Sequence, residues 1–153
     1  MSTSPQLKTG IYTIVNKHTG QAVGRARAED RSALPRRIVA LPAGATNDEG
    51  SQWVIKAKDG KYELSVLGAS TFAQDQLVFG DLFGDQVEQW KIEAQTHLGE
   101  NTYTIVQSFG IGGWVLEGDD ATTQVACRGL IVGHSHPPFF PANQLWVITP
   151  VAA

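Results

Sequence analysis

The sequence feature that most constrains the fold is a pair of aromatic motifs that recurs three times along the 153 residues. Each copy opens on a tyrosine with an aliphatic residue two positions later, at Tyr12, Tyr62 and Tyr103. Each copy closes on Trp-x-Ile, at Trp53, Trp90 and Trp146, with a glutamine directly before the first two tryptophans and one residue further back from the third. A spacing of two residues places both side chains on one face of a β-strand. The chain is therefore predicted to contain three similar units whose first and last strands share one core.

The regions between these motifs favour further short strands over helices. Short segments rich in Val, Ile, Thr, Tyr and Trp alternate with Gly, Asp, Asn and Pro, and no stretch keeps an apolar helical pattern for three turns. Successive tyrosines are about 50 and about 40 residues apart, which leaves room for four short strands in each unit. We predict one all-β domain over residues 1–153, with units at about 10–58, 60–98 and 100–150 and twelve strands in pseudo-threefold symmetry.

The charge and the hydropathy of the chain exclude several classes of partner. The formal net charge is -3 at pH 7, whereas proteins that bind nucleic acids or anionic membranes carry a basic excess. There is no run of about 18 apolar residues, and the first residues lack the apolar segment of a signal peptide. We therefore expect a cytoplasmic monomer that binds neither nucleic acid nor membrane. Cys127 is the only cysteine, so an intramolecular disulfide is not possible.

The sequence carries no signature of an enzyme or of a metal site. Neither a Gly-x-Ser-x-Gly elbow nor a His-Glu-x-x-His element occurs. His134 and His136 form a His-Ser-His pair before two prolines, but no third ligand with suitable spacing lies nearby. We expect a protein without catalytic activity, cofactor or metal.

One loop concentrates the basic side chains of the chain. Residues 25–37 contain five of the six arginines, and they follow a predicted hairpin that ends at Gly24. Trypsin-like proteases bind substrate through a deep pocket with a carboxylate at its floor, and a guanidinium can enter that pocket and pair with the charge. A loop held in place by a rigid scaffold loses little entropy when it binds. The loop is therefore predicted to insert an arginine into a trypsin-like protease.

Within this loop, Arg27 is the predicted primary specificity residue. It lies between two small residues, Ala26 and Ala28, which allow a protease cleft to close on the backbone. Arg25 is expected at the end of a strand, whereas Arg31 follows two acidic residues that could engage it within the loop. The predicted flanks of the reactive residue are Gly24, Arg25, Ala26, Ala28 and Glu29.

The repeated motifs resemble those of the β-trefoil fold, a six-strand barrel capped by three hairpins. Within that fold, residues 10–16 and 24–30 and the closing Gln144-Leu145-Trp146 resemble the mushroom serine protease inhibitors called mycospins. The resemblance implies an inhibitor of trypsin-like proteases. It also implies a reactive residue in the loop between the second and third strands, here residues 25–36, and Arg27 is the position that it points to.

Two other loops remain open as reactive sites. The legume Kunitz inhibitors, which resemble this chain in fold, use the loop between the fourth and fifth strands, and that loop contains Lys58 here. Some mushroom relatives use the loop before the last strand, here residues 128–144, which contains Arg128 but no lysine. Arg31 is a third alternative, inside the first loop.

Two other functions also remain open. Ricin-type lectins of the same fold carry Gln-x-Trp motifs and bind sugars through an acidic residue and an aromatic platform in each repeat. Gln144-Leu145-Trp146 fits that motif, but the other two closing tryptophans lack the spacer residue. Inhibition of cysteine proteases, as in the mushroom mycocypins, would depend on glycine-rich loops instead of arginine.

Overall fold

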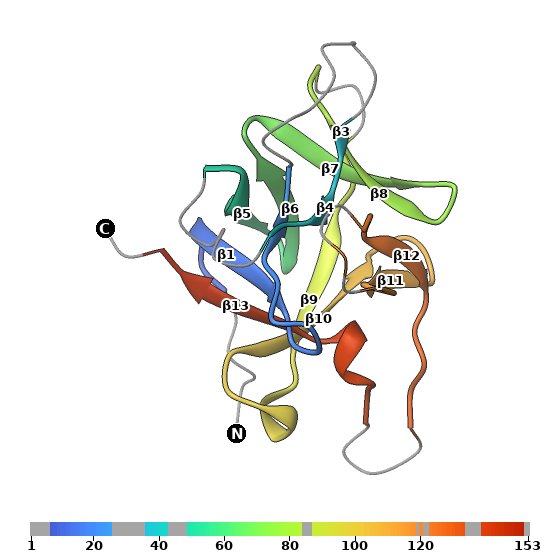
Figure 1. Ribbon diagram of the computed structural model, residues 1–153. Coiled ribbons are helices and arrows are strands. Elements are labelled where there is room, and N and C mark those ends of the chain that lie inside the picture. Colours follow the sequence, from blue (N-terminus) through green and yellow to red (C-terminus); the bar gives the residue numbers. More distant parts are fainter. Residues whose placement is uncertain are drawn as a thin grey trace.

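In the computed structural model, the described residues are 7–25, 36–42, 49–83, 87–118, 120, 123–133 and 139–151, and they form an all-β protein (Figure 1). Its strands are β1 (Gly10–Asn16), β2 (Val23–Gly24), β3 (Arg36–Arg37), β4 (Val39–Ala40), β5 (Gln52–Lys58), β6 (Lys61–Val66), β7 (Ala69–Gln74), β8 (Leu77–Asp81), β9 (Trp90–Ala94), β10 (Thr102–Gln107), β11 (Gly112–Val115), β12 (Ala126–Gly129) and β13 (Trp146–Pro150). Helical structure in these residues is limited to short 3-10 turns at Glu49–Ser51, Thr96–Leu98 and Ala142–Gln144, and none could span a membrane. The all-β prediction is therefore confirmed.

The sheet closes on itself. Neighbouring strands pair in the order β11-β12-β8-β7-β6-β5-β1-β13-β10-β9, and β10 also pairs with β11, so the circuit closes into a barrel. A second pairing, Tyr62 with Trp90, joins β6 to β9 and closes a smaller ring of β6, β5, β1, β13, β10 and β9. Closure leaves no free edge in this ring.

The predicted count of twelve strands is not confirmed, because the described residues contain thirteen. The extra strand arises at Ile38, which separates β3 from β4. Before Ile38, Arg36 pairs with Gly80 of β8; after it, Val39 pairs with Gly24 of β2. The chain changes its partner strand at this residue, so residues 36–40 form two short strands and not one.

The three closing tryptophans occupy equivalent places in the core. Trp53, Trp90 and Trp146 are each 0% exposed. The indole N–H of each donates a hydrogen bond to the second strand of its own unit: to the Val23 carbonyl (2.9 Å), to Thr71 Oγ1 (3.1 Å) and to the Trp114 carbonyl (3.1 Å). Most buried indole N–H groups in proteins have such a partner, and in these three tryptophans the partner repeats with the motif.

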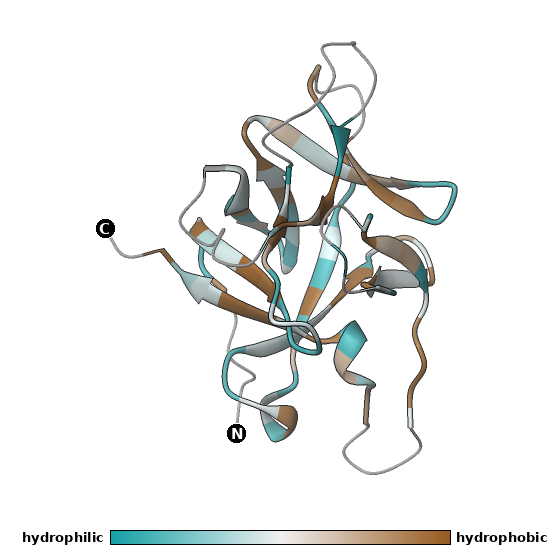
Figure 2. Ribbon diagram, in the orientation of Figure 1, coloured by the Kyte–Doolittle hydropathy of each residue, from teal (hydrophilic) through white to brown (hydrophobic). Residues whose placement is uncertain are grey.

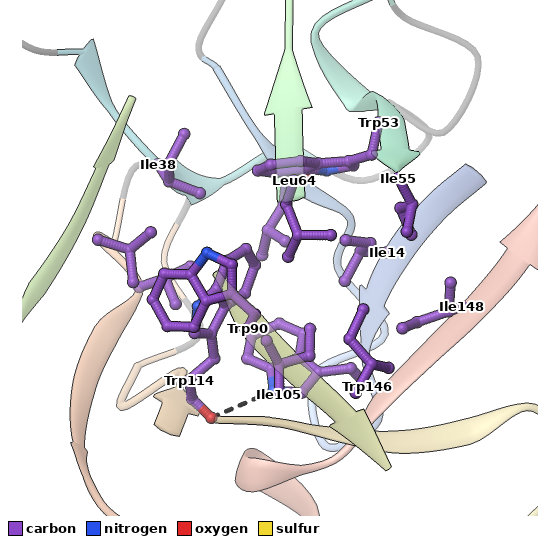
Figure 3. Close-up of a cluster of buried hydrophobic side chains, with 14 of the residues drawn as sticks. Ile14, Ile38, Trp53, Ile55, Leu64, Trp90, Ile105, Trp114, Trp146 and Ile148 are labelled. Carbon is purple, nitrogen blue, oxygen red and sulfur yellow. Dashed lines mark hydrogen bonds between the residues drawn. The ribbon is translucent and has the colours of Figure 1, made fainter. Parts of the chain in front are cut away.

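The fourth tryptophan fills the centre of this arrangement. Trp114 is fully buried, and its ring centroid lies 5.6, 5.5 and 5.9 Å from those of Trp53, Trp90 and Trp146. Two of the three contacts are edge-to-face, the geometry that aromatic quadrupoles favour. Figure 3 shows the side chains of this cluster converging from different strands. The core is thus built around one residue that belongs to none of the repeated motifs.

The three opening tyrosines lie together at another part of the core. The Tyr12 hydroxyl donates to the Lys8 carbonyl (2.7 Å) and the Tyr62 hydroxyl donates to the Leu7 carbonyl (3.3 Å). Burial raises the pKa of Tyr62 and of Tyr103, and proximity to the other phenols raises it further. The N-terminal segment is therefore fixed to the barrel by its backbone carbonyls.

Candidate functional site

The arginine loop is described at its two stems. Arg27, its predicted flanks Ala26, Ala28 and Glu29, and the alternative Arg31 all lie outside the described residues. Gly24 and Arg25 form the first stem, and Arg36 and Arg37 form the second. The ten residues 26–35 lie between these two stems in the sequence.

The first stem is in close contact with the backbone that precedes β5. The Arg25 N–H donates to the Gly50 carbonyl at 3.0 Å. A Cβ atom on Gly24 would lie 1.8 Å from the Gly50 oxygen, and a Cβ on Gly50 would lie 2.4 Å from the Arg25 oxygen. The backbones at Gly24 and Gly50 can approach so closely because neither residue has a Cβ atom. The chain direction at the start of the loop is therefore set by a glycine pair.

The side chain of Arg25 belongs to the scaffold. Its Nη1 donates to the Leu67 carbonyl at 2.8 Å, in the turn between β6 and β7. Leu67 and Gly68 both have positive φ, +49° and +79°, which is typical of a tight two-residue hairpin turn. A neighbouring turn thus braces the first stem, and the Arg25 guanidinium is engaged there.

The first stem is also connected to the core. Val23, the residue before Gly24, accepts the hydrogen bond from the Trp53 indole and is 0% exposed. On the opposite strand, Val39 pairs with Gly24 and is buried as well. The start of the loop therefore has little freedom to move without disturbing the barrel.

The second stem is held by β8. Arg36 pairs with Gly80 and Arg37 with Phe79, while the Ile38 N–H donates to the Val78 carbonyl at 3.2 Å. Arg36 is half-buried and Arg37 is exposed. Both stems are therefore fixed to neighbouring parts of the sheet, and fixed residues lose little conformational entropy on binding.

The glycine pair gives a prediction for the Gly24→Ala variant. The new methyl group would meet the Gly50 carbonyl, so the first stem must shift. We expect unfolding free energy to fall by about 1–3 kcal/mol, as for other overpacked sites. Urea denaturation measures this change.

Gly129→Ala is the matched control for that variant. Gly129 also lies in a strand, but no atom lies within 4 Å of its added Cβ. Its stability should stay within about 0.5 kcal/mol of the parent. Equal stability of Gly24→Ala and Gly129→Ala would show that the first stem is not tightly constrained.

The alternative loop around Lys58 has a different shape. Lys58 ends β5 and pairs with Lys61, the first residue of β6. Only Asp59 and Gly60 separate them, with φ values of +54° and +80°. A protease cleft requires an extended segment on both sides of the reactive residue, and this turn reverses the chain immediately after Lys58.

Arg128, the alternative reactive residue before the last strand, lies in a strand and is engaged in an ion pair. Arg128 lies in β12 opposite Gly113, and its Nε donates to Glu117 Oε1 at 2.6 Å. Its guanidinium is thus paired with a carboxylate that follows β11. His134 and His136, further along this loop, lie outside the described residues.

The features of a ricin-type sugar site are not present at the Gln-x-Trp motif. Gln144 is 1% exposed: its amide oxygen accepts from the Ile131 N–H (2.7 Å) and its amide nitrogen donates to the Ile131 carbonyl (2.8 Å). Trp146 is 0% exposed, so its ring cannot serve as a platform for a sugar. This glutamine has a structural role, which is to fasten a loop to the barrel.

Metal-binding and nucleophilic chemistry have no support in the described part of the chain. No group of three or more His, Cys, Asp or Glu side chains there could hold a metal ion. The Cys127 thiol is buried, and burial together with the nearby Glu88 raises its pKa to about 12. A thiol that stays protonated at neutral pH is a poor nucleophile.

Three features of this site could not be found from the sequence. Gly24 contacts Gly50, which is 26 positions away in the sequence, and Arg25 donates to Leu67, which is 42 positions away. No local sequence motif marks either contact. The break between β3 and β4 at Ile38 depends on a change of partner strand. Only the Asp59-Gly60 pair gave a local signal, for the tight turn beside Lys58.

Comparison with known proteins gives relatives along almost the whole chain. Residues 5–150 match a family described as peptidase inhibitor I66. A serine protease inhibitor of Lentinula edodes is 41% identical over 143 residues, which is 93% of this chain and 96% of the relative.

Solved structures show the same fold. A proteinase inhibitor from Coprinopsis cinerea has 37% identity and a TM-score of 0.88, with 95% of this chain and all of that chain (100%) covered. A designed threefold-symmetric protein, ThreeFoil, has 18% identity and a TM-score of 0.71, with 93% of this chain and 99% of that chain covered.

Proposed function

Because the chain belongs to the peptidase inhibitor I66 family, we propose that it inhibits trypsin-like serine proteases by inserting Arg27 into their specificity pocket. Proteins of this family are inhibitors and not enzymes, so the partner is a protease. The observation that carries the proposal is the pair of fixed stems around residues 26–35, the loop that contains Arg27.

The proposed binding follows the chemistry of substrate recognition. The Arg27 guanidinium enters the pocket and pairs with the carboxylate at its floor, forming charge-assisted hydrogen bonds. The small side chains of Ala26 and Ala28 let the protease contact the backbone on both sides. The scaffold fixes both stems of the loop, Gly24 and Arg25 on one side and Arg36 and Arg37 on the other, so these residues lose little ordering entropy on binding.

The scaffold for this loop is proposed to be a twelve-strand β-trefoil. In this interpretation, β3 and β4 are two halves of one strand, interrupted at Ile38. The equivalent hydrogen bonds of the three closing tryptophans and the similarity to a designed threefold-symmetric protein support it.

Titration of purified trypsin and papain with the protein, together with a glycan array, tests the proposed function. We expect trypsin activity to fall to zero at one inhibitor per enzyme, with papain unaffected and no glycan bound. Inhibition of papain without trypsin would indicate a cysteine protease inhibitor. Glycan binding without inhibition of either enzyme would indicate a lectin.

A further inference from the structure

Two exposed apolar side chains lie beside the stems of the arginine loop. Leu67 is 47% exposed and Phe83 is 66% exposed. Leu67 is next to the first stem, because its carbonyl accepts the hydrogen bond from Arg25. Phe83 is next to the second stem, because it follows β8 by two residues and Gly80 of β8 pairs with Arg36.

The strand register brings these two side chains to the same end of the barrel. β7 pairs with β8 with Ser70 opposite Asp81, near the start of β7 and at the end of β8. The turn that contains Leu67 precedes β7, and the segment that contains Phe83 follows β8. Both therefore lie at the same end of the β7–β8 pair. Figure 1 shows β3 and the end of β8 together at the top of the molecule, and Figure 2 shows hydrophobic colour on the segment after β8.

Both side chains are presented on fixed backbone. The Phe83 N–H donates to Asp81 Oδ1 at 3.0 Å, and the Asp81 side chain is buried at the end of β8. Leu67 occupies a tight turn and is held through its carbonyl by Arg25. Exposed apolar groups on such supports lose little entropy when a partner covers them.

A stable protease–inhibitor interface is larger than the arginine loop alone can provide. Protease–inhibitor interfaces engage about 20–30 residues on each side, whereas residues 26–35 number ten. The remaining contacts must come from surface next to the stems. Aromatic side chains are enriched in the centre of such interfaces.

From these observations, and resting on the proposed function, we infer that Leu67 and Phe83 form a secondary contact surface for the trypsin-like protease. Together they make an apolar pair, one on each side of the arginine loop, that packs against the enzyme around its cleft. Arg27 supplies specificity for the pocket, and the apolar pair lengthens the lifetime of the complex.

The test is the inhibition constant for trypsin of Phe83→Ala, Leu67→Ala and the double variant. Each single variant should weaken inhibition about tenfold, mainly through faster dissociation, as for a well-packed interface side chain. Circular dichroism and thermal denaturation should match the parent, since both residues are exposed.

Phe109→Ala is the matched control for this test. Phe109 is 79% exposed, and the Lys61 ammonium lies 4.2 Å from its ring centroid. Lys61 begins β6 and Leu67 follows its end, so the backbones of these two residues are roughly 20 Å apart by strand rise, and Phe109 contacts the end of β6 that is away from Leu67. Its loss should leave the inhibition constant unchanged.

Three outcomes would overturn the inference. If Phe83→Ala and Leu67→Ala inhibit as well as the parent while Arg27→Asn does not inhibit, the apolar pair makes no contact and the proposed function still stands. If Phe109→Ala weakens inhibition as much as Phe83→Ala, the effect is not specific to the surface beside the loop. If Arg27→Asn retains full inhibition, the proposed role of the loop fails, and the secondary surface fails with it.

Discussion

Replacement of Arg27 by Asn is expected to raise the inhibition constant for trypsin roughly 30- to several-thousand-fold. Truncation of one partner leaves the pocket carboxylate buried without its counterion, which costs about 2–5 kcal/mol or more. By affinity arithmetic, that loss gives the stated range. The measurement is a tight-binding inhibition assay with trypsin, and the folded stability should stay within about 0.5 kcal/mol of the parent.

Three variants control for this result. Arg27→Lys should keep most of the inhibition, because an ammonium still reaches the pocket, although it lacks the fork geometry of the guanidinium. Arg31→Asn and Lys58→Asn should inhibit trypsin as the parent does. If Arg27→Asn inhibits fully while Arg31→Asn or Lys58→Asn does not, the reactive residue is assigned wrongly although the inhibitor function stands.

Replacement of Trp114 by Ala is expected to cause the largest loss of stability, about 3–5 kcal/mol in the free energy of unfolding. Trp114 is fully buried and contacts the other three tryptophan rings, so its removal leaves a cavity at the centre of the core. Urea denaturation followed by tryptophan fluorescence measures this loss.

Phe109→Ala is the control for the core variant as well. It also removes an aromatic ring, but an exposed one, and its effect should stay within about 0.5 kcal/mol. A loss of less than about 1 kcal/mol for Trp114→Ala would contradict the central role of this residue in the core.

The sequence predicted the closing tryptophans correctly as core residues because they recur at one phase of the repeat. Trp53, Trp90 and Trp146 share a neighbouring glutamine and an isoleucine two positions later, and all three are buried. Trp114 carried no such signal, since the residues in the equivalent hydrogen-bonding role are Val23 and Thr71. Trp114 occupies the centre of the core without a counterpart in the other two units, so the threefold repeat of motifs could not identify it.

The candidate loop was predictable in its position but not in its support. Five arginines in one interval after a hairpin mark it in the sequence, and Gly24 marks its beginning. Its two stems are held by tertiary contacts, which are made with the Gly50 backbone, the Leu67 carbonyl and β8. These partners depend on closure of the barrel, so local sequence patterns do not reveal them.

Cleavage of the protein by trypsin reports directly on whether Arg27 occupies the specificity pocket. A loop that binds as a substrate presents the Arg27–Ala28 peptide bond to the catalytic serine. Mass spectrometry after prolonged incubation with a catalytic amount of trypsin should therefore show slow cleavage of that bond alone. Full inhibition of trypsin with this bond intact, or with cleavage after Arg31 or Lys58 in its place, would contradict the proposed role of Arg27.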